Sequence, residues 1–206
     1  MINEAAEARS LEHMILIGSM GRNSGKTTLA LELIRLWKDR FPVTAVKITS
    51  VDREKENCPH GRGCGACTGF SGDYLLEEMK DGNGEKDTDK FVMAGAHRVF
   101  WLRSTRAALR EAFTDFSITV PDDSLIICES NCLAQLLRPA CFIMLSHSRD
   151  YPGKPSAQAV IDRADIVLRG SYTVSDITST AAQIKIGQNE RGQPMIQLPE
   201  YRGIIT

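Results

Sequence analysis

The sequence predicts a three-layer αβα fold in which helices cover both faces of a mainly parallel sheet. Three observations support this prediction. Short apolar runs alternate with segments of helical periodicity, the later runs are apolar at nearly every position, and a glycine-rich turn joins the first run to the first helical segment. Continuous apolar runs are typical of strands that helices bury on both faces. The alternation indicates one α/β domain with right-handed crossovers.

The amino-terminal part predicts a strand, a turn, a helix and a second strand. Met14–Ser19 is an apolar run of strand length. In the segment Lys26–Arg40 the apolar side chains recur at helical spacing, at Leu29, Leu33, Leu36 and Trp37. Pro42 then marks a break, and Val43–Thr49 is expected to form the next strand.

Periodicity weakens between Val51 and about Lys90, where glycines, cysteines and charged residues accumulate. Within this stretch only Tyr74–Lys80 has a helical pattern. A long irregular segment inside a compact domain is usually functional. We therefore expect a single nucleotide-binding domain over residues 1–206, with a Cys/Gly-rich insertion at about residues 52–90.

Regular structure is expected to resume at Arg98–Leu102 and to continue to the carboxyl-terminal tail, which from Gln188 reads as irregular. The expected strands are Leu125–Glu129, Cys141–Ser146 and Asp165–Leu168, and the expected helices are Ser104–Phe116, Leu133–Leu137, Ala157–Arg163 and Ser175–Lys185.

The glycine-rich turn carries the most specific motif, Gly25-Lys26-Thr27-Thr28, between a predicted strand and a predicted helix. In a phosphate-binding P-loop, backbone N–H groups surround the phosphates, a lysine reaches the β and γ phosphates, and a hydroxyl ligates Mg²⁺. The helix N-terminus adds a favourable dipole. The chain is therefore expected to be a P-loop NTPase. Its nucleotide-binding residues would be Gly21, Arg22, Asn23, Ser24, Gly25, Lys26, Thr27 and Thr28. The motif usually has glycine five residues before Gly25, where this chain has Met20.

Magnesium in such a site also needs a carboxylate near the end of a buried strand. Glu129 ends the run Leu125–Glu129, and Asp52 follows the second strand, so both acids are candidates, with Lys26, for the catalytic set. Lys47 lies inside the second strand. It could pair with a phosphate or with one of these two acids, or it could be a structural lysine that is salt-bridged or extends its charge to solvent.

These residues resemble the family of molybdopterin-guanine dinucleotide biosynthesis protein B, the MobB-like P-loop proteins. The resemblance lies in the segments Asn23–Leu29, Val46–Thr49 with Asp52, and Ile126–Asn131. It implies GTP binding, a role in molybdenum-cofactor assembly beside a cofactor-biosynthesis protein, and a homodimer. It also implies that Lys26 and Thr27 hold phosphate and magnesium, and that Lys47, Asp52 and Glu129 match the family's lysine, aspartate and strand-end glutamate. The chain departs from the family pattern at Met20, at Thr49-Ser50-Val51 and at Ser130.

Three cysteines fall within ten residues of the glycine-rich insertion. Cys58, Cys64 and Cys67, with His60, offer enough thiolate and imidazole ligands for tetrahedral Zn²⁺. The same cysteines could hold an iron–sulfur cluster, or they could be unligated thiols. The other three cysteines, Cys128, Cys132 and Cys141, lie in or beside apolar runs and are expected in the core.

Two further features are less specific. Arg103, Arg106 and Arg110 recur at intervals of three and four, which would place them on one helix face either as a phosphate clamp or as solvated charges paired with acids. The nucleotide base is expected near residues 146–154, where Asp150 could accept from guanine.

The formal net charge of −1 and the isoelectric point near 6.4 argue against non-specific binding to nucleic acid or membranes. No apolar run is long enough to span a bilayer, and the first twelve residues do not resemble a signal peptide, so a cytoplasmic location is expected. The leading function is a slowly hydrolysing GTP- or ATP-binding accessory protein. The alternatives are a small-molecule kinase and a non-catalytic, nucleotide-gated metal-binding module.

Overall fold

A computed structural model of the chain describes residues 7, 11–51, 71–150, 152–198 and 203–205. Eight strands form one sheet in the order β10-β7-β6-β1-β5-β2-β4-β3. The strands of this sheet are β1 (Met14–Ser19), β2 (Val43–Ser50), β3 (Tyr74–Glu78), β4 (Arg98–Ser104), β5 (Leu125–Glu129), β6 (Cys141–His147), β7 (Ile166–Gly170) and β10 (Gly203–Ile205). Within the described residues, every pairing in this sheet is parallel except that of β3 with β4.

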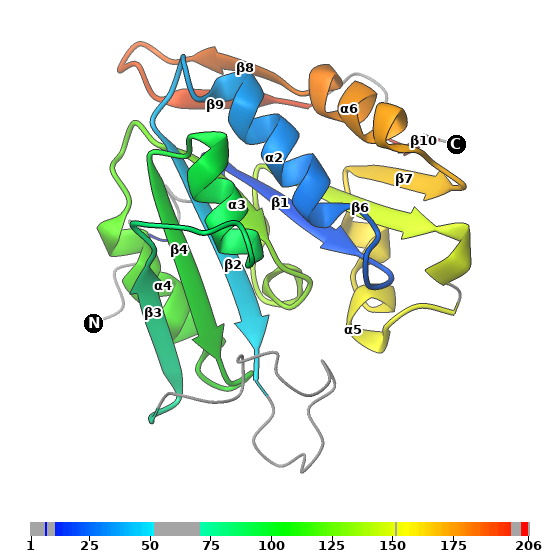
Figure 1. Cartoon of the computed structure of the whole chain (residues 1–206), viewed down its shortest axis with the longest axis horizontal. Coiled ribbons are helices and arrows are strands. Elements are labelled where there is room, and N and C mark those ends of the chain that lie inside the picture. Colours follow the sequence, from blue (N-terminus) through cyan, green and yellow to red (C-terminus); the bar gives the residue numbers. More distant parts are fainter. Residues whose placement is uncertain (1–6, 8–10, 52–70, 151, 199–202, 206) are drawn as a thin grey trace.

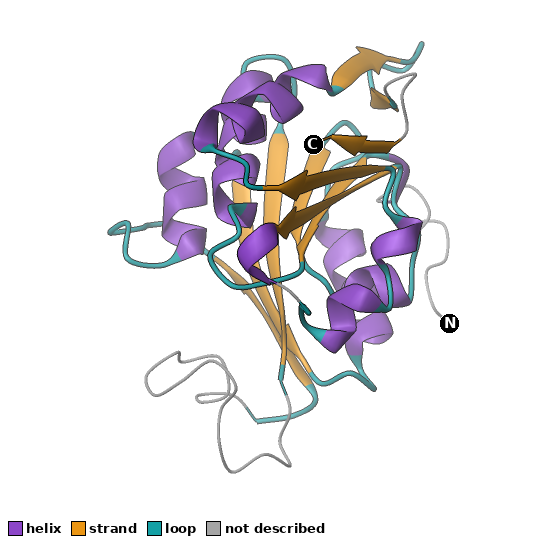
Figure 2. Ribbon diagram, turned by 90° about the vertical axis from the view of Figure 1, so that its right-hand side faces the viewer, coloured by secondary structure: helices purple, strands orange, loops and turns teal. Residues whose placement is uncertain are grey.

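Helices cover both faces of the sheet, as Figures 1 and 2 show. The α-helices in the described residues are α2 (Lys26–Trp37), α3 (Asp87–Ala94), α4 (Leu109–Thr119), α5 (Pro155–Gln158) and α6 (Val174–Gln183). Helices α2, α3 and α6 pack on one face, and α4 and α5 pack on the other. The predicted three-layer αβα architecture with a mainly parallel sheet is confirmed.

Helix α2 shows how the sequence pattern becomes packing. Its buried side chains are Leu29, Ala30, Leu33, Ile34 and Trp37. These positions form one helical stripe, and the stripe joins the inner cluster made by alternate residues of β1, β2 and β5. Burial of this stripe fixes the angle at which the helix leaves β1. The turn between them is therefore held at the carboxyl edge of the sheet (Figure 1).

Several element predictions are wrong in the segment after β2. Tyr74–Lys80 was expected to be helical, but Tyr74–Glu78 forms β3, antiparallel to β4 at the sheet edge. Tyr74 and Leu76 pack on the α4 side, which is the period-2 pattern of a strand. Helix α3 was not predicted at all. Its signals are two acids in the first turn and Gly95 (φ 94°) directly after its last residue.

The carboxyl-terminal half differs from the prediction mainly in the lengths of its elements. Helix α4 begins at Leu109 rather than Ser104, because β4 continues to Ser104. The expected helix Leu133–Leu137 is a 3₁₀ turn, Leu133–Gln135. The expected helix Ala157–Arg163 is the short α5 followed by a 3₁₀ turn, Ile161–Arg163. The tail contains β10 and a hairpin of β8 (Lys185–Gln188) and β9 (Pro194–Gln197).

In the described part of the chain, no helix combines the length and apolar character needed to cross a membrane.

Candidate nucleotide-binding site

The turn between β1 and α2 adopts two left-handed backbone conformations. Asn23 has φ 54° and Gly25 has φ 88°. At Gly25 a side chain would be strained and would also collide with Ile177 of α6, since an added Cβ would lie 2.5 Å from Ile177 Cδ1. Met20 is not among the residues with positive φ. Its backbone continues the sheet instead, donating to the carbonyl of Leu145 at 2.8 Å, so a side chain is tolerated where the motif usually has glycine.

The start of the turn is fixed by Asn131, which follows β5. Its Nδ2 donates to the carbonyl of Ser19, and its Oδ1 accepts from the Ser19 N–H, both at 2.8 Å. Gly18 permits this approach, because an added Cβ there would lie 3.1 Å from Asn131 Oδ1. The side-chain amide thus extends the pairing between β1 and β5 by one residue. This contact anchors the last residue of β1 where the turn begins.

Lys26, Thr27 and Glu129 converge at the N-terminus of α2. The Lys26 ammonium donates to Ser19 Oγ at 2.8 Å and lies 3.9 Å from Glu129 Oε1. Thr27 Oγ1 donates to Glu129 Oε2 at 3.0 Å. Glu129 is only 6% exposed, so its charge requires these partners. The three residues predicted to handle phosphate and magnesium are therefore side by side.

Strand register adds Lys47 to this group, since Lys47 lies opposite Glu129 in the pairing of β2 with β5. Its ammonium lies 3.8 Å from Glu129 Oε1 and also donates to Asp87, the first residue of α3. Burial lowers the pKa of Lys47, but attraction to Glu129 and Asp87 outweighs it, and the net pKa is raised. The pKa of Asp87 is lowered, because its contacts with Lys47 and Lys90 outweigh the effect of burial. Lys47 and Asp87 thus form a charged pair beside Glu129.

The remaining predicted nucleotide-binding residues lie along the same turn. Gly21, Arg22 and Asn23 precede the buried Ser24, and Thr28 is half-buried in the first turn of α2. Asp52, Cys58, His60, Cys64 and Cys67 lie outside the described residues, as does the side chain of Asp150. Within the described part of the chain, no group of three or more His, Cys, Asp or Glu residues is arranged to hold a metal ion.

Three residues of this site were not predicted: Ser19, Asp87 and Asn131. Ser19 and Asn131 are ordinary small polar residues in sequence, and only the pairing of β1 with β5 brings them together. Asp87 lies forty residues from Lys47. The sequence signal that could have indicated Asp87 is the pair of acids in the first turn of α3, which marks the start of a helix.

The predicted helix face of arginines is wrong. Arg103 belongs to β4, where it is 5% exposed and pairs with Glu77 of β3 at 2.6 Å. Arg110 belongs to α4 and pairs with Glu7 at 2.8 Å. The two side chains therefore lie on different elements and have acidic partners, which agrees with the alternative of paired charges and not with a phosphate clamp.

The three core cysteines are buried free thiols, as expected. Burial raises the pKa of Cys128 far above its ordinary value, and that of Cys141 to about 12, with smaller contributions from neighbouring groups. Burial also raises the pKa of Cys132. These thiols stay protonated at neutral pH, which fits packing and not metal binding.

Comparisons with known proteins add one structural similarity. No protein-family model matches the chain, and no curated protein sequence is similar to it. Among solved structures, the chain is similar to LpxK from Aquifex aeolicus in complex with ATP, with a TM-score of 0.44 and 17% sequence identity. The similarity covers 76% of this chain and 47% of LpxK, so the chain spans about half the length of that protein.

Proposed function

We propose that this chain is a P-loop nucleoside triphosphatase that binds GTP or ATP with Mg²⁺ along Gly21–Thr28 and hydrolyses it slowly. The observation that carries the proposal is the convergence of Lys26, Thr27 and Glu129 at the N-terminus of α2. An ammonium, a hydroxyl and a carboxylate at the start of a helix are the groups that a triphosphate and its metal ion require.

In this proposal the Lys26 ammonium leaves Ser19 Oγ and takes up the β and γ phosphates, while the N-terminal amides of α2 face their oxygens. The Thr27 hydroxyl and the Glu129 carboxylate, 3.0 Å apart, are oxygen ligands of the kind that Mg²⁺ prefers. Bound there, Mg²⁺ would neutralise charge on the phosphate oxygens. Asp52 remains the alternative to Glu129 as the carboxylate that binds Mg²⁺.

Lys47 and Asp87 complete the electrostatic environment in this proposal. Lys47 lies between Glu129 and Asp87, so its charge is shared by two carboxylates. A triphosphate brings several negative charges next to Glu129. Lys47 compensates for part of that charge, and Asp87 keeps its ammonium in place.

The base is proposed to bind at the carboxyl ends of β6 and β7, where open α/β sheets usually hold ligands. His147, the last residue of β6, meets Tyr172 after β7 in an edge-to-face contact with ring centroids 4.9 Å apart. Aromatic surfaces of this kind can pack against a purine. This location agrees with the sequence-based choice of residues 146–154.

The finer function rests on the MobB-like resemblance. It favours GTP over ATP, a role in molybdenum-cofactor or related metal-cofactor biosynthesis with a protein partner, and a homodimer. A Zn²⁺ or iron–sulfur centre on Cys58, Cys64 and Cys67, with His60 as a further Zn²⁺ ligand, is proposed separately, from the spacing of the cysteines and not from the resemblance. The kinase alternative loses its main support, because the arginines expected to form its acceptor site do not share a helix.

Nucleotide binding and turnover, measured together, test this proposal. Wild-type protein is titrated with GTP and with ATP, each with Mg²⁺ and with EDTA, and phosphate release is followed in parallel. We expect Mg²⁺-dependent binding and slow release of inorganic phosphate. Binding without turnover would favour the non-catalytic module, and absence of binding with either nucleotide would remove the proposed function.

A further inference from the structure

Four consecutive carbonyl groups in the turn between β1 and α2 each accept a hydrogen bond from a side chain. The carbonyl of Gly21 accepts from Ser19 Oγ at 2.7 Å, and that of Arg22 accepts from Ser24 Oγ at 3.4 Å. The carbonyl of Asn23 accepts from Arg149 Nη2 at 2.6 Å, and that of Ser24 accepts from the Tyr172 hydroxyl at 2.8 Å. Donors therefore surround the turn on its carbonyl side.

This arrangement sets the direction of the amide groups. In a trans peptide the C=O and the following N–H point in opposite directions. Holding the Asn23 carbonyl on Arg149 turns the Ser24 N–H away from Arg149, and holding the Ser24 carbonyl on Tyr172 turns the Gly25 N–H away from Tyr172. These amides belong to the stretch whose N–H groups would surround phosphate in a P-loop.

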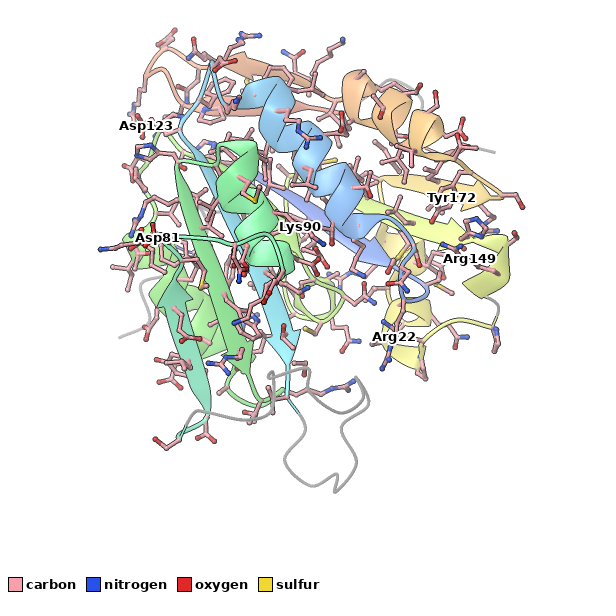
Figure 3. The ribbon with its side chains drawn as sticks, in the orientation of Figure 1. Arg22, Asp81, Lys90, Asp123, Arg149 and Tyr172 are labelled. Atoms are coloured by element: carbon pink, nitrogen blue, oxygen red, sulfur yellow. The ribbon has the colours of Figure 1, made fainter. Side chains whose placement is uncertain are left out.

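Two of the four donors come from outside the turn. Arg149 lies in the 3₁₀ turn after β6, and Tyr172 lies between β7 and α6. The two loops are joined to each other by a 2.9 Å hydrogen bond between Ser148 and Ser171. Figure 3 shows Arg149 and Tyr172 on the side of the turn that faces β6 and β7, with Arg22 near its outer end. Both side chains bind backbone carbonyls of the turn, and such contacts leave no motif in the sequence.

We infer that Arg149 and Tyr172 are positioning residues for the triphosphate, because they orient the peptides on either side of Ser24 so that the N–H groups face the phosphates. The inference rests on the proposed function. Without these donors, each peptide loses a hydrogen bond that fixes its orientation, and a rotated carbonyl would repel the phosphate that the adjoining N–H should bind. The Tyr172 hydroxyl and the Arg149 guanidinium act on the phosphates, whereas the Tyr172 ring, which Tyr172→Phe keeps, remains beside His147 for the base.

This distinction can be tested with a ligand that has no base. Wild type and Tyr172→Phe are titrated by calorimetry with Mg²⁺ and either inorganic tripolyphosphate or GTP. Removal of one hydrogen bond should raise the Kd about five- to tenfold. Because the substitution changes only the turn that contacts the phosphates, the Kd should rise by the same factor for tripolyphosphate and for GTP. Tyr74→Phe is the matched control, since it removes a hydroxyl that bonds to Asp115 on α4, and we expect wild-type affinities.

Arg149→Met is the second variant, with Arg163→Met as its control for loss of one exposed positive charge. We expect weaker binding of both probes by Arg149→Met and little change for Arg163→Met. Thermal melts confirm that each variant is folded. A loss confined to GTP would assign the Tyr172 hydroxyl to the base and overturn the inference, as would unchanged tripolyphosphate affinity in both variants. If wild-type protein binds neither probe, the proposed function itself fails, and the inference fails with it.

Discussion

At the scale of single residues, Glu129 is the carboxylate on which the candidate site depends. It accepts from Thr27, has Lys26 and Lys47 within 4 Å, and is almost fully buried. A buried carboxylate without partners would be costly, but two ammonium groups and a hydroxyl compensate for it. The same arrangement leaves the carboxylate adjacent to the turn where phosphate is proposed to bind.

Glu129→Gln should retain nucleotide binding but weaken Mg²⁺-dependent hydrolysis. The amide keeps the shape of the side chain and loses the negative charge that would hold the ion or its water. Loss of one metal ligand or its support should reduce the apparent Mg²⁺ affinity about 10- to 100-fold. The measurement is phosphate release against Mg²⁺ concentration, with a nucleotide titration beside it. Should Asp52→Asn have the larger effect, Asp52 is the metal acid and the choice of Glu129 is wrong.

The residues that carry proposed chemistry were partly visible in the sequence. Lys26 and Thr27 belong to a contiguous motif, and Glu129 ends an apolar strand, so position along the chain was enough to find them. Asp87, Ser19 and Asn131 reach the site only through strand register and the packing of α3. Arg149 and Tyr172 contact backbone atoms, which place no requirement on neighbouring sequence.

At the scale of elements, α3 connects the sheet edge to the candidate site through the Lys47–Asp87 pair. The lowered pKa of Asp87 means that the pair stabilises the fold above the ordinary carboxyl value of 3.8, and that this contribution is lost as pH falls through the folded pKa. The raised pKa of Lys47 means that its contribution is present below 10.5 and is lost as pH rises above that value. Stability from this pair should therefore be constant near neutral pH.

Asp87→Asn should lower the free energy of unfolding at pH 7 by about 0.5–1 kcal/mol, since both partners are about a quarter exposed and solvent screens them. The difference from wild type should begin to shrink as pH falls below about 3.8, where the carboxyl of the unfolded chain becomes protonated, and should disappear once pH is below the lowered pKa of the folded state. Urea unfolding at pH 7 and pH 3 measures both values. Asp81→Asn, at an exposed carboxyl before α3, is the control. An equal deficit for Asp87→Asn at both pH values would contradict the role of the ion pair.

Element type was hardest to predict where the chain is short of large apolar residues. Five residues, Tyr74–Glu78, fit a helix turn or a strand by composition, and pairing with the exposed edge of β4 decides for the strand. Apart from β10, which lies in the tail expected to be irregular, the parallel strands were predicted to within about two residues at each end. Burial on both faces makes such strands largely apolar, so they stand out in the sequence.

The cysteine-rich insertion carries its own prediction. Residues 52–72 contain few large apolar side chains, so burial alone would not offset a backbone entropy of roughly 1–2 kcal/mol per ordered residue. Metal coordination by Cys58, Cys64 and Cys67 would supply local folding energy. The double variant Cys64→Ser, Cys67→Ser should lose metal content and become sensitive to protease in this segment, while nucleotide affinity is unchanged. Equal metal content and equal protease resistance would show that the cysteines have no such role.

At the scale of the whole molecule, the αβα fold follows from the order of elements, and the site follows from the fold. The carboxyl ends of parallel strands share one edge, so the ends of β1, β2 and β5 bring Ser19, Lys47 and Glu129 together. That much is implied by a parallel sheet. The order of the strands in the sheet is not implied by the sequence, because an apolar run does not specify which other strands lie beside it. The sequence therefore predicted the edge of the sheet on which the candidate site lies, but not which residues of neighbouring strands contact each other there.

The choice of nucleotide also belongs to this scale. The MobB-like resemblance predicts that GTP binds more tightly than ATP, although the sequence has no Asn-Lys-x-Asp signature for guanine. Competition of each nucleotide against a fluorescent GTP analogue gives the ratio of the two affinities. Equal affinities, or tighter ATP binding, would remove the main reason for a role in molybdenum-cofactor assembly and would leave the phosphate site unaffected.

The central claim is that the turn before α2 binds a triphosphate through Lys26. Calorimetric titration of wild type and Lys26→Ala with Mg²⁺ and GTP tests it most directly, with thermal melts of both and Lys185→Ala as the control at a distant exposed lysine. We predict that Lys26→Ala has no measurable binding and a melting curve close to that of wild type, because the lysine charge acts on phosphate and not in the core. Unchanged affinity in folded Lys26→Ala protein would contradict the claim.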